Sequence, residues 1–129
     1  MVEKHSRKTA LLSAFGWAVG YLLAGKLVGT FLPVPAAGWA RLLKVCVAAP
    51  LVEETVFRGA VQRCLRPLGR RQALLLQAVL FAVQHDSPAG MLYALSCGLV
   101  LGALADRTGH LWPGMLLHSL NNLLVFAAG

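Results

Sequence analysis

Two carboxylates and a guanidinium, the side chains best suited to chemistry in this chain, lie within apolar sequence at 52–59 (VEETVFRG). Each ionisable group at a bilayer centre costs roughly 2.5–3.5 kcal/mol on insertion scales, so all three need partners inside the protein. Glu54 and Arg58 are four residues apart and share a helix face, which predicts an ion pair. Glu53 projects about 100° away from Glu54 around the helix. It therefore has no partner within its own helix and is a candidate general base. The alternative interpretation is an ion pair that only fixes helix packing.

Two further polar pairs lie on other apolar segments. Phe81 and His85 are four residues apart, as are His118 and Asn122, and the spacing predicts that each pair shares one helix face. A lone histidine is more often structural than catalytic. Three such pairs on three apolar helices are expected to converge, because unpaired polar groups are costly in lipid. A carboxylate, two imidazoles and a carboxamide around one water would supply the base, the water-orienting partner and the oxyanion donors that hydrolysis needs.

The order and placement of these motifs resemble the CPBP family of intramembrane proteases. That family comprises the type II CAAX prenyl proteases and the bacteriocin-processing group, and it is also called the Abi family. The resemblance covers roughly residues 43–126 and leaves the first apolar segment outside. It rests on three motifs: Glu53-Glu54-x-x-x-Arg58, Phe81-x-x-x-His85 and His118-x-x-x-Asn122.

The resemblance implies a glutamate-dependent peptidase, a glutamic peptidase, that works inside the membrane. By this analogy Glu53 activates the water and His85 holds it. His118 and Asn122 form the oxyanion hole. The residues that support the site are Glu54, Arg58 and Phe81.

The predicted site could work either with a metal ion or without one. Glu53, His85 and His118 would also make a ligand set used by many zinc hydrolases, so zinc held by these three residues is the alternative. The chain contains no H-E-x-x-H motif, and the ligands would come from three separate helices. An asparagine is better suited to donating hydrogen bonds than to binding zinc. We favour a site without a metal or any other cofactor, to be tested by metal content and by activity in chelator.

Composition predicts a polytopic membrane protein. The 129 residues are 57% hydrophobic and only 13% charged, with a mean hydropathy of +0.66. We expect an all-α bundle of about five transmembrane helices with the active site inside it. The chain would form one domain over 1–129, with a tail and first span at 1–36 and the family core at 37–129. The predicted spans cover 9–32, 38–65, 72–84, 89–105 and 111 to the end.

Local signals refine these spans. Pro50 should loosen the second helix just before the carboxylates, because proline lacks an N–H. The third span, followed by His85 and a helix-stop sequence, is short for a full crossing. Cys46, Cys64 and Cys97 are expected to be packing residues rather than disulfide or metal ligands. Close helix approach is predicted at glycine pairs spaced by four: Gly16 and Gly20, Gly25 and Gly29, Gly98 and Gly102.

Charge predicts the partners and the orientation. The net charge of +7 comes from short basic clusters between apolar runs, which suit lipid head groups and topology signalling rather than nucleic acid. We therefore expect two partners, membrane lipid and a protein substrate with a membrane-associated segment. The positive-inside rule puts the N-terminus in the cytoplasm and the site in the outer half of the bilayer. The composition suggests the inner membrane of a bacterium.

The first apolar segment and the function of the whole protein each have an alternative interpretation. The first apolar segment would be a cleaved signal peptide if Val34-Pro35-Ala36 were a cleavage site, although the run is longer than a usual signal core. The whole protein could instead be a non-enzymatic immunity or scaffold protein, or a small proton-coupled transporter. The absence of an inverted sequence repeat argues against transport. Within the family, candidate substrates are C-terminal sorting tails, bacteriocin-like leader peptides and prenylated C-terminal tails.

Overall fold

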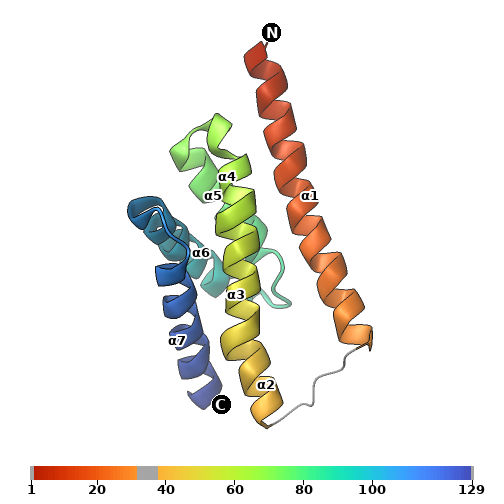
Figure 1. Cartoon of the computed structure of the whole chain (residues 1–129), viewed down its shortest axis with the longest axis vertical. Coiled ribbons are helices and arrows are strands. Elements are labelled where there is room, and N and C mark those ends of the chain that lie inside the picture. The colour runs from red at the N-terminus through yellow and green to blue at the C-terminus, as the bar shows by residue number, and fades with distance from the viewer. Residues whose placement is uncertain (1, 32–37, 129) are drawn as a thin grey trace.

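The structure is a computed structural model that describes the backbone of residues 2–31 and 38–128 and the side chains of residues 6–28 and 38–128. All regular elements in these ranges are helices, which confirms the predicted all-α fold of a membrane bundle. They form five rods (Figure 1). The loop predicted around Pro33 and the alternative cleavage site after it lie outside the described residues.

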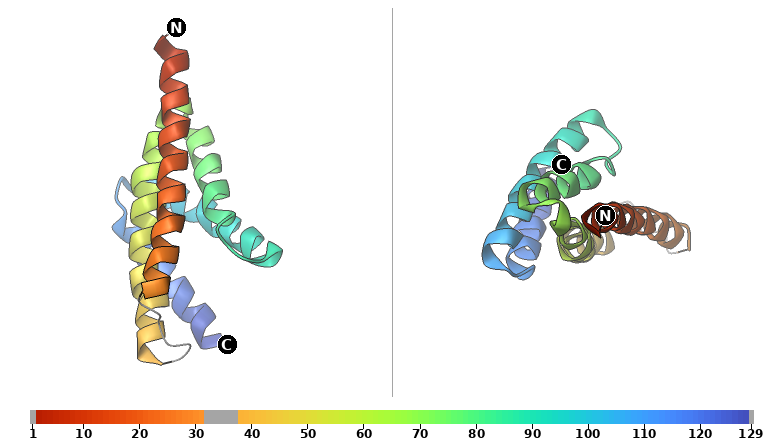
Figure 2. Two further views of the ribbon diagram at one scale, coloured as in Figure 1. Left: turned by 90° about the vertical axis from the view of Figure 1, so that its right-hand side faces the viewer. Right: turned by 90° about the horizontal axis from the view of Figure 1, so that it is seen from above.

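The central rod is built from five consecutive helical segments and carries both carboxylates. In Figure 1 it runs nearly straight through the bundle. Seen from above, α1 (Val2–Phe31) lies on one side of it, and α6 and α7 lie on the other (Figure 2). The segments are α2 (Trp39–Leu43), η1 (Lys44–Ala48), α3 (Ala49–Glu54), η2 (Thr55–Val61) and α4 (Gln62–Cys64).

Two of these segments, η1 and η2, are wide π-helical turns. In η1 the N–H of Ala49 bonds to the carbonyl of Lys44, five residues back. The next residue is Pro50, which has no N–H and cannot bond to the carbonyl of Val45 in the same pattern. The predicted loosening ahead of the carboxylates therefore takes the form of a π turn, a feature that is frequent at functional sites.

The third rod is α5 (Arg70–Ala82), joined to α4 through the 3₁₀ turn η3 (Arg66–Leu68). Its 13 residues span about 20 Å, less than the roughly 30 Å of a bilayer core, as the short third span predicted. The spacing of Phe81 and His85 predicted that their side chains lie together, and the rings do pack against each other. His85 is not on the helix itself, however, because α5 ends at Ala82 and His85 lies in the following turn. The next helix starts soon afterwards, with Ser87 as its N-cap: the Ser87 hydroxyl accepts a hydrogen bond from Gly90 N at 3.0 Å.

The last two rods are α6 (Pro88–Thr108) and α7 (Trp112–Ala128), separated by a turn after Gly109, whose φ of 72° favours glycine. Close packing at Gly98 is confirmed: a Cβ there would lie 3.1 Å from Ala78 of α5. The same prediction is wrong for α1, where a Cβ at Gly16, Gly20 or Gly25 would meet nothing within 4 Å. The face of α1 that packs is instead the alanine stripe Ala10, Ala14 and Ala18.

Apolar side chains cover the outside of the bundle as well as its interior. Within the described residues, two segments are long and apolar enough to cross a membrane by length and composition: Ser6–Val28 within α1, and the whole of α6. The buried centre contains Phe57 and Val61 of η2 together with Phe81 of α5. Many large apolar side chains of α1, α6 and α7 are exposed, as expected of lipid-facing helices.

Candidate active site

The centre of the site is the carboxylate of Glu54, which is fully buried at the end of α3. Its Oε1 lies 3.1 Å from Nη1 of Arg58 and 2.9 Å from Nδ1 of His118. The expected Glu54–Arg58 ion pair is therefore present, and it reaches a histidine 64 residues further along the chain. The π turn η2 starts at Thr55, so the widened backbone lies between the two partners of the pair.

Arg58 is held by charge and by an aromatic ring. Its guanidinium carbon lies 4.6 Å from the ring centroid of Phe81, within cation–π range, and the residue is only 2% exposed. Although Nη1 is close to Glu54, none of the three guanidinium nitrogens makes a well-directed hydrogen bond to a described protein acceptor. Glu54 and Arg58 thus form an ion pair by distance alone, and the N–H groups of Arg58 have no hydrogen-bond acceptor among the described residues.

Glu53 projects from the same turn toward a different set of groups. Its side chain is 18% exposed, and Oε2 lies 3.6 Å from Nε2 of His118. Its Oε1 accepts a hydrogen bond of 2.8 Å from the hydroxyl of Tyr21 in α1. Tyr21 was not among the predicted site residues, and it precedes the segment covered by the resemblance. The available signal was a phenol within an apolar span, because a buried tyrosine hydroxyl usually finds a hydrogen-bond partner.

His118 bridges the two carboxylates from α7, with Nδ1 toward Glu54 and Nε2 toward Glu53. Donation from Nδ1–H to Glu54 fixes the orientation of the imidazole, as carboxylates commonly do for catalytic histidines. Nε2 then faces Glu53 at a distance slightly too long for a direct hydrogen bond, so that one water could bond to both. Among the described residues, no three His, Cys, Asp or Glu side chains form a metal-ligand group.

Phe81 contacts both histidines of the predicted site. Its ring centroid lies 5.3 Å from that of His85 and 5.9 Å from that of His118, both in edge-to-face geometry. Nδ1 of His85 lies 3.3 Å from the carbonyl oxygen of Phe81. In the described part of the chain, no hydrogen bond or ion pair joins His85 to Glu53. His85 therefore lies beside the carboxylate cluster, connected to it through the aromatic ring.

Asn122 is directed at the backbone of the central rod. Its Nδ2 donates a 2.9 Å hydrogen bond to the carbonyl of Val45, the group that would face the missing N–H of Pro50. Asn122 thus satisfies a carbonyl that the wide turn and the proline leave without a backbone donor. The fold therefore brings together Glu53, Glu54, Arg58, Phe81 and His118, and it places His85 and Asn122 at the edges of this group.

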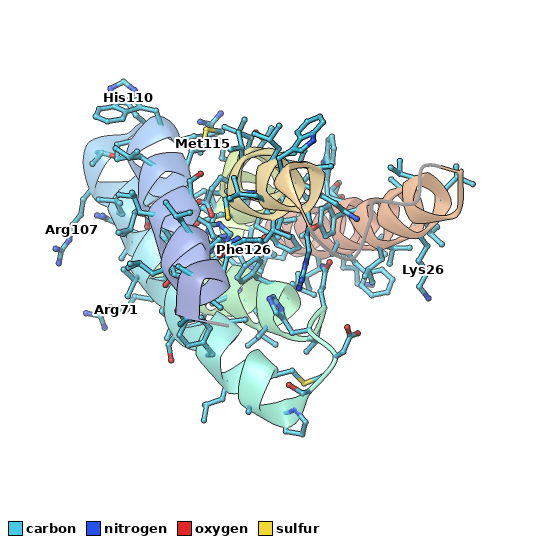
Figure 3. All side chains as sticks on the ribbon, turned by 90° about the horizontal axis from the view of Figure 1, so that it is seen from below. Lys26, Arg71, Arg107, His110, Met115 and Phe126 are labelled. Carbon is cyan, nitrogen blue, oxygen red and sulfur yellow. The ribbon has the colours of Figure 1, made fainter. Side chains whose placement is uncertain are left out.

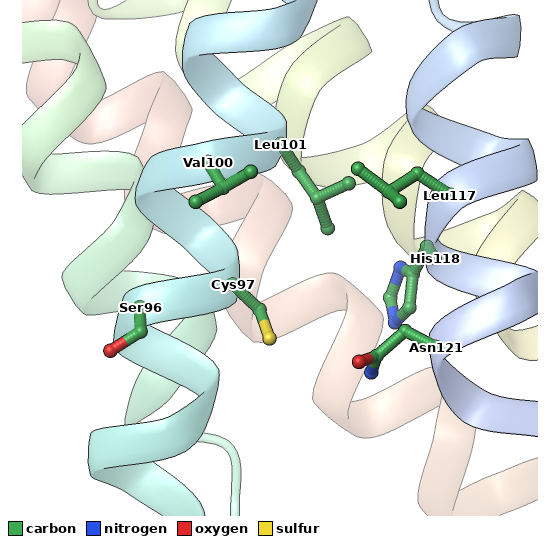
Figure 4. A pocket seen from close by; sticks show the side chains of 7 residues that line it. All are labelled: Ser96, Cys97, Val100, Leu101, Leu117, His118 and Asn121. Atoms are coloured by element: carbon green, nitrogen blue, oxygen red, sulfur yellow. The ribbon is translucent and has the colours of Figure 1, made fainter. Parts of the chain in front are cut away.

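An apolar cavity of about 260 Å³ opens next to this cluster, between α6 and α7. In Figure 4, His118 and Asn121 point from α7 toward Cys97 and Leu101 of α6 across this space. The lining side chains are mostly apolar, so the cavity can take an apolar group and bring it against the imidazole of His118. The complete lining is Ser96, Cys97, Val100, Leu101, Leu117, His118 and Asn121.

No curated protein and no solved structure matches the chain. The family model described as "Type II CAAX prenyl endopeptidase Rce1-like" matches residues 34–124 and therefore covers the central rod, α5, α6 and most of α7. The first helix, with Tyr21, lies outside the match. Because most of the chain is matched, the protein belongs to the Rce1-like family of type II CAAX prenyl endopeptidases.

Proposed function

We propose that this protein is an intramembrane endopeptidase in which Glu53 activates a water molecule for hydrolysis of a peptide bond. The observation that carries the proposal is the position of His118, whose two ring nitrogens face the carboxylates of Glu53 and Glu54. A purely structural ion pair would need only Glu54 and Arg58. The second carboxylate, partly exposed and bonded to Tyr21, is the group that this simpler interpretation leaves unexplained.

The proposed reaction uses each group according to its position. Glu53 Oε2 takes a proton from the water, the water oxygen bonds to the substrate carbonyl carbon, and the carbonyl oxygen becomes an oxyanion. The proton then passes to the amide nitrogen as the C–N bond breaks. His118 Nε2 orients the water or the oxyanion, while Glu54 and Arg58 hold the imidazole and balance its charge. The distances favour His118 over His85 for the place next to the water.

His85 and Asn122 receive roles that fit their positions at the edges. His85 packs against the ring of Phe81, and we propose that its imidazole contacts the substrate from that side. Asn122 holds the carbonyl of Val45 with one N–H of its amide, and Nδ2 carries a second N–H that can donate to an oxyanion. We therefore propose that Asn122 both stabilises the wide turn and contributes to the oxyanion hole.

The apolar cavity beside His118 is proposed to receive a side chain of the substrate. A cavity of about 260 Å³ accommodates one large apolar side chain, and it lies between two helices with exposed apolar surfaces. A membrane-associated segment could thus enter from the lipid. C-terminal sorting tails and bacteriocin-like leader peptides fit this requirement, as do prenylated C-terminal tails. With a bacterial inner-membrane location, the first two are preferred.

The test compares the membrane proteomes of cells that carry the wild type, Glu53→Gln and the matched control Asp86→Asn. Both substitutions replace a carboxylate by an amide, but Asp86 is exposed in the turn after α5. We expect at least one protein whose terminus is processed in the wild type and the control but not in Glu53→Gln cells. Identical termini in all three strains, together with a function retained by Glu53→Gln, would indicate a non-enzymatic protein instead.

The metal question is tested on the purified protein. We expect no stoichiometric zinc and cleavage that persists in chelator. Stoichiometric zinc whose removal abolishes cleavage would overturn the metal-free proposal and support ligation by Glu53, His85 and His118.

The orientation is tested with single cysteines at Asp86 and Arg71, after replacement of the native cysteines. The two positions lie at opposite ends of α5, and both are exposed. A membrane-impermeant thiol reagent applied to intact cells should label position 86 and spare position 71 if the N-terminus is cytoplasmic. The reverse pattern would place the site in the inner half of the bilayer.

A further inference from the structure

The first helix, α1, lies wholly outside the family match, and yet it contacts the proposed general base. The hydroxyl of Tyr21 donates a hydrogen bond of 2.8 Å to Oε1 of Glu53. Among the described residues, this is the only hydrogen bond that the carboxylate of Glu53 accepts. Its other oxygen, Oε2, lies 3.6 Å from Nε2 of His118, which is too far for a direct hydrogen bond. The direct hydrogen bond to Glu53 therefore comes from α1.

The neighbouring carboxylate of Glu54 is held quite differently. It is fully buried, and its partners Arg58 and His118, at 3.1 Å and 2.9 Å, both belong to the matched family segment. Glu53 is partly exposed and has no such pair of partners. A glutamate side chain has several staggered rotamers, each of which puts the carboxylate in a different place. A hydrogen bond to an ionised acceptor is among the stronger ones, so the phenol can select the rotamer that Glu53 keeps.

Aromatic packing holds the ring of Tyr21 in place. Its centroid lies 5.5 Å from that of Phe57, with an interplanar angle of 75°. Phe57 is fully buried, and its ring lies 5.2 Å from the ring of Phe81, again edge to face. Phe81 in turn contacts both histidines. The ring of Tyr21 is therefore the outer end of an aromatic row that passes through the centre of the bundle, and this packing stabilises the orientation in which its hydroxyl reaches Glu53.

Small residues bring α1 close to the central rod. The buried face of α1 is the alanine stripe Ala10, Ala14 and Ala18. Tyr21 follows three residues later on the same face. Beyond it, the side chains of residues 22–28 are all exposed, and Figure 3 shows Lys26 pointing away from the other helices. Tyr21 therefore lies where α1 leaves the bundle, so that a small shift of α1 moves its hydroxyl relative to Glu53.

We propose that Tyr21 is a positioning residue of the peptidase and that α1 is part of its active site rather than only a membrane anchor. The hydroxyl of Tyr21 holds Glu53 so that Oε2 stays beside His118, where the water is activated. The alanine stripe sets the distance between Tyr21 and the central rod. This inference rests on the proposed function, because Glu53 needs a fixed position only if it acts on the water.

The test measures kcat and KM of the full chain in detergent, with a peptide that copies the segment whose processing requires Glu53 in the proteome comparison. Tyr21→Phe removes the donor, and Ala14→Leu adds bulk to the buried face of α1, where Ala14 is 1% exposed. Gly16→Leu is the matched control, because a Cβ at Gly16 meets nothing within 4 Å. We expect kcat to fall about tenfold for Tyr21→Phe and Ala14→Leu, with KM changed by less than about twofold. Gly16→Leu should keep both constants of the wild type.

The double variant Tyr21→Phe/Ala14→Leu should be no slower than Ala14→Leu alone, because both changes remove the same contact. Thermal unfolding of each variant gives the folded fraction, and if Ala14→Leu does not fold, Tyr21→Phe decides the matter. The inference is overturned if Tyr21→Phe keeps the kcat of the wild type or loses activity only in proportion to its loss of folded protein. It is also overturned if Gly16→Leu slows cleavage as much as Ala14→Leu. Failure of the proposed function gives a different result, in which wild-type and Glu53→Gln cells process the same segments.

Discussion

Replacement of Arg58 by methionine should damage the fold more than any other single change in the central rod. Methionine provides a long, flexible side chain but removes the guanidinium that lies 3.1 Å from Glu54, in a site where both residues are almost fully buried. Breaking one side of a buried ion pair costs roughly 3–5 kcal/mol, because the remaining charge is left uncompensated. His118 still contacts Glu54 at 2.9 Å, so we expect a value near the lower limit, about 3 kcal/mol. The melting temperature should then fall by roughly 10 °C.

Thermal unfolding is measured in detergent and monitored with a thiol-reactive dye, which reports exposure of the buried Cys46. Arg63→Met is the matched control, because it removes an exposed arginine one and a half turns away and should shift the midpoint by less than about 2 °C. The double variant Arg58→Met/Glu54→Gln should recover a large part of the loss, since it removes both charges together. The reasoning is refuted if Arg58→Met unfolds within about 1 kcal/mol of the wild type, or if the double variant is less stable than the single one.

Three further predictions follow from individual contacts. Tyr21→Phe removes the hydrogen bond to Glu53 and should lower the cleavage rate by about tenfold, measured by turnover. The cost in stability should be near 1 kcal/mol, measured by the melting midpoint. Unchanged turnover would exclude a positioning role for Tyr21. Asn122→Ala should destabilise the protein by about 1–3 kcal/mol, because the carbonyl of Val45 loses its hydrogen-bond donor. The loss of stability should be smaller in a Pro50→Ala background, where a backbone N–H can replace the amide donor. Equal losses in both backgrounds would contradict the role assigned to Asn122. Gly98→Leu should abolish recovery of folded protein from membranes, because its backbone packs directly against α5, and normal recovery would show that the helices can separate without penalty.

The fold followed from patterns that act locally or through lipid. Long apolar runs separated by basic or proline-containing turns are sufficient for a helical membrane bundle, because a chain in lipid must satisfy its backbone hydrogen bonds internally. Pro50 likewise indicated a loosened helix from its missing N–H alone. The glycine pairs of α1 show the limit of such patterns, since a small residue permits close approach but does not determine which neighbour arrives. The face of α1 that packs against the bundle carries alanines rather than these glycines.

In the candidate site, too, contacts within one helix could be predicted and contacts between helices could not. The Glu54–Arg58 pair could be predicted because both partners lie on one helical turn. The contact of His118 with Glu54 joins residues 64 positions apart, and no spacing rule gives its geometry. The hydrogen bond between Tyr21 and Glu53 was harder still to predict, because the two residues lie on different rods and the helix of Tyr21 precedes the matched family segment.

The sequence by itself determined which groups had to be paired: charges and amides in apolar helices cannot remain unsatisfied, so their convergence followed from solvation cost alone. The tertiary structure decided which pairs form. It placed His118 rather than His85 beside Glu53, directed Asn122 to the carbonyl opposite Pro50, and ended α5 before His85. The reason is that solvation cost depends only on the kind of group and its burial, whereas the choice of partner depends on the rotation and offset of packed helices, which every contact in the bundle sets together.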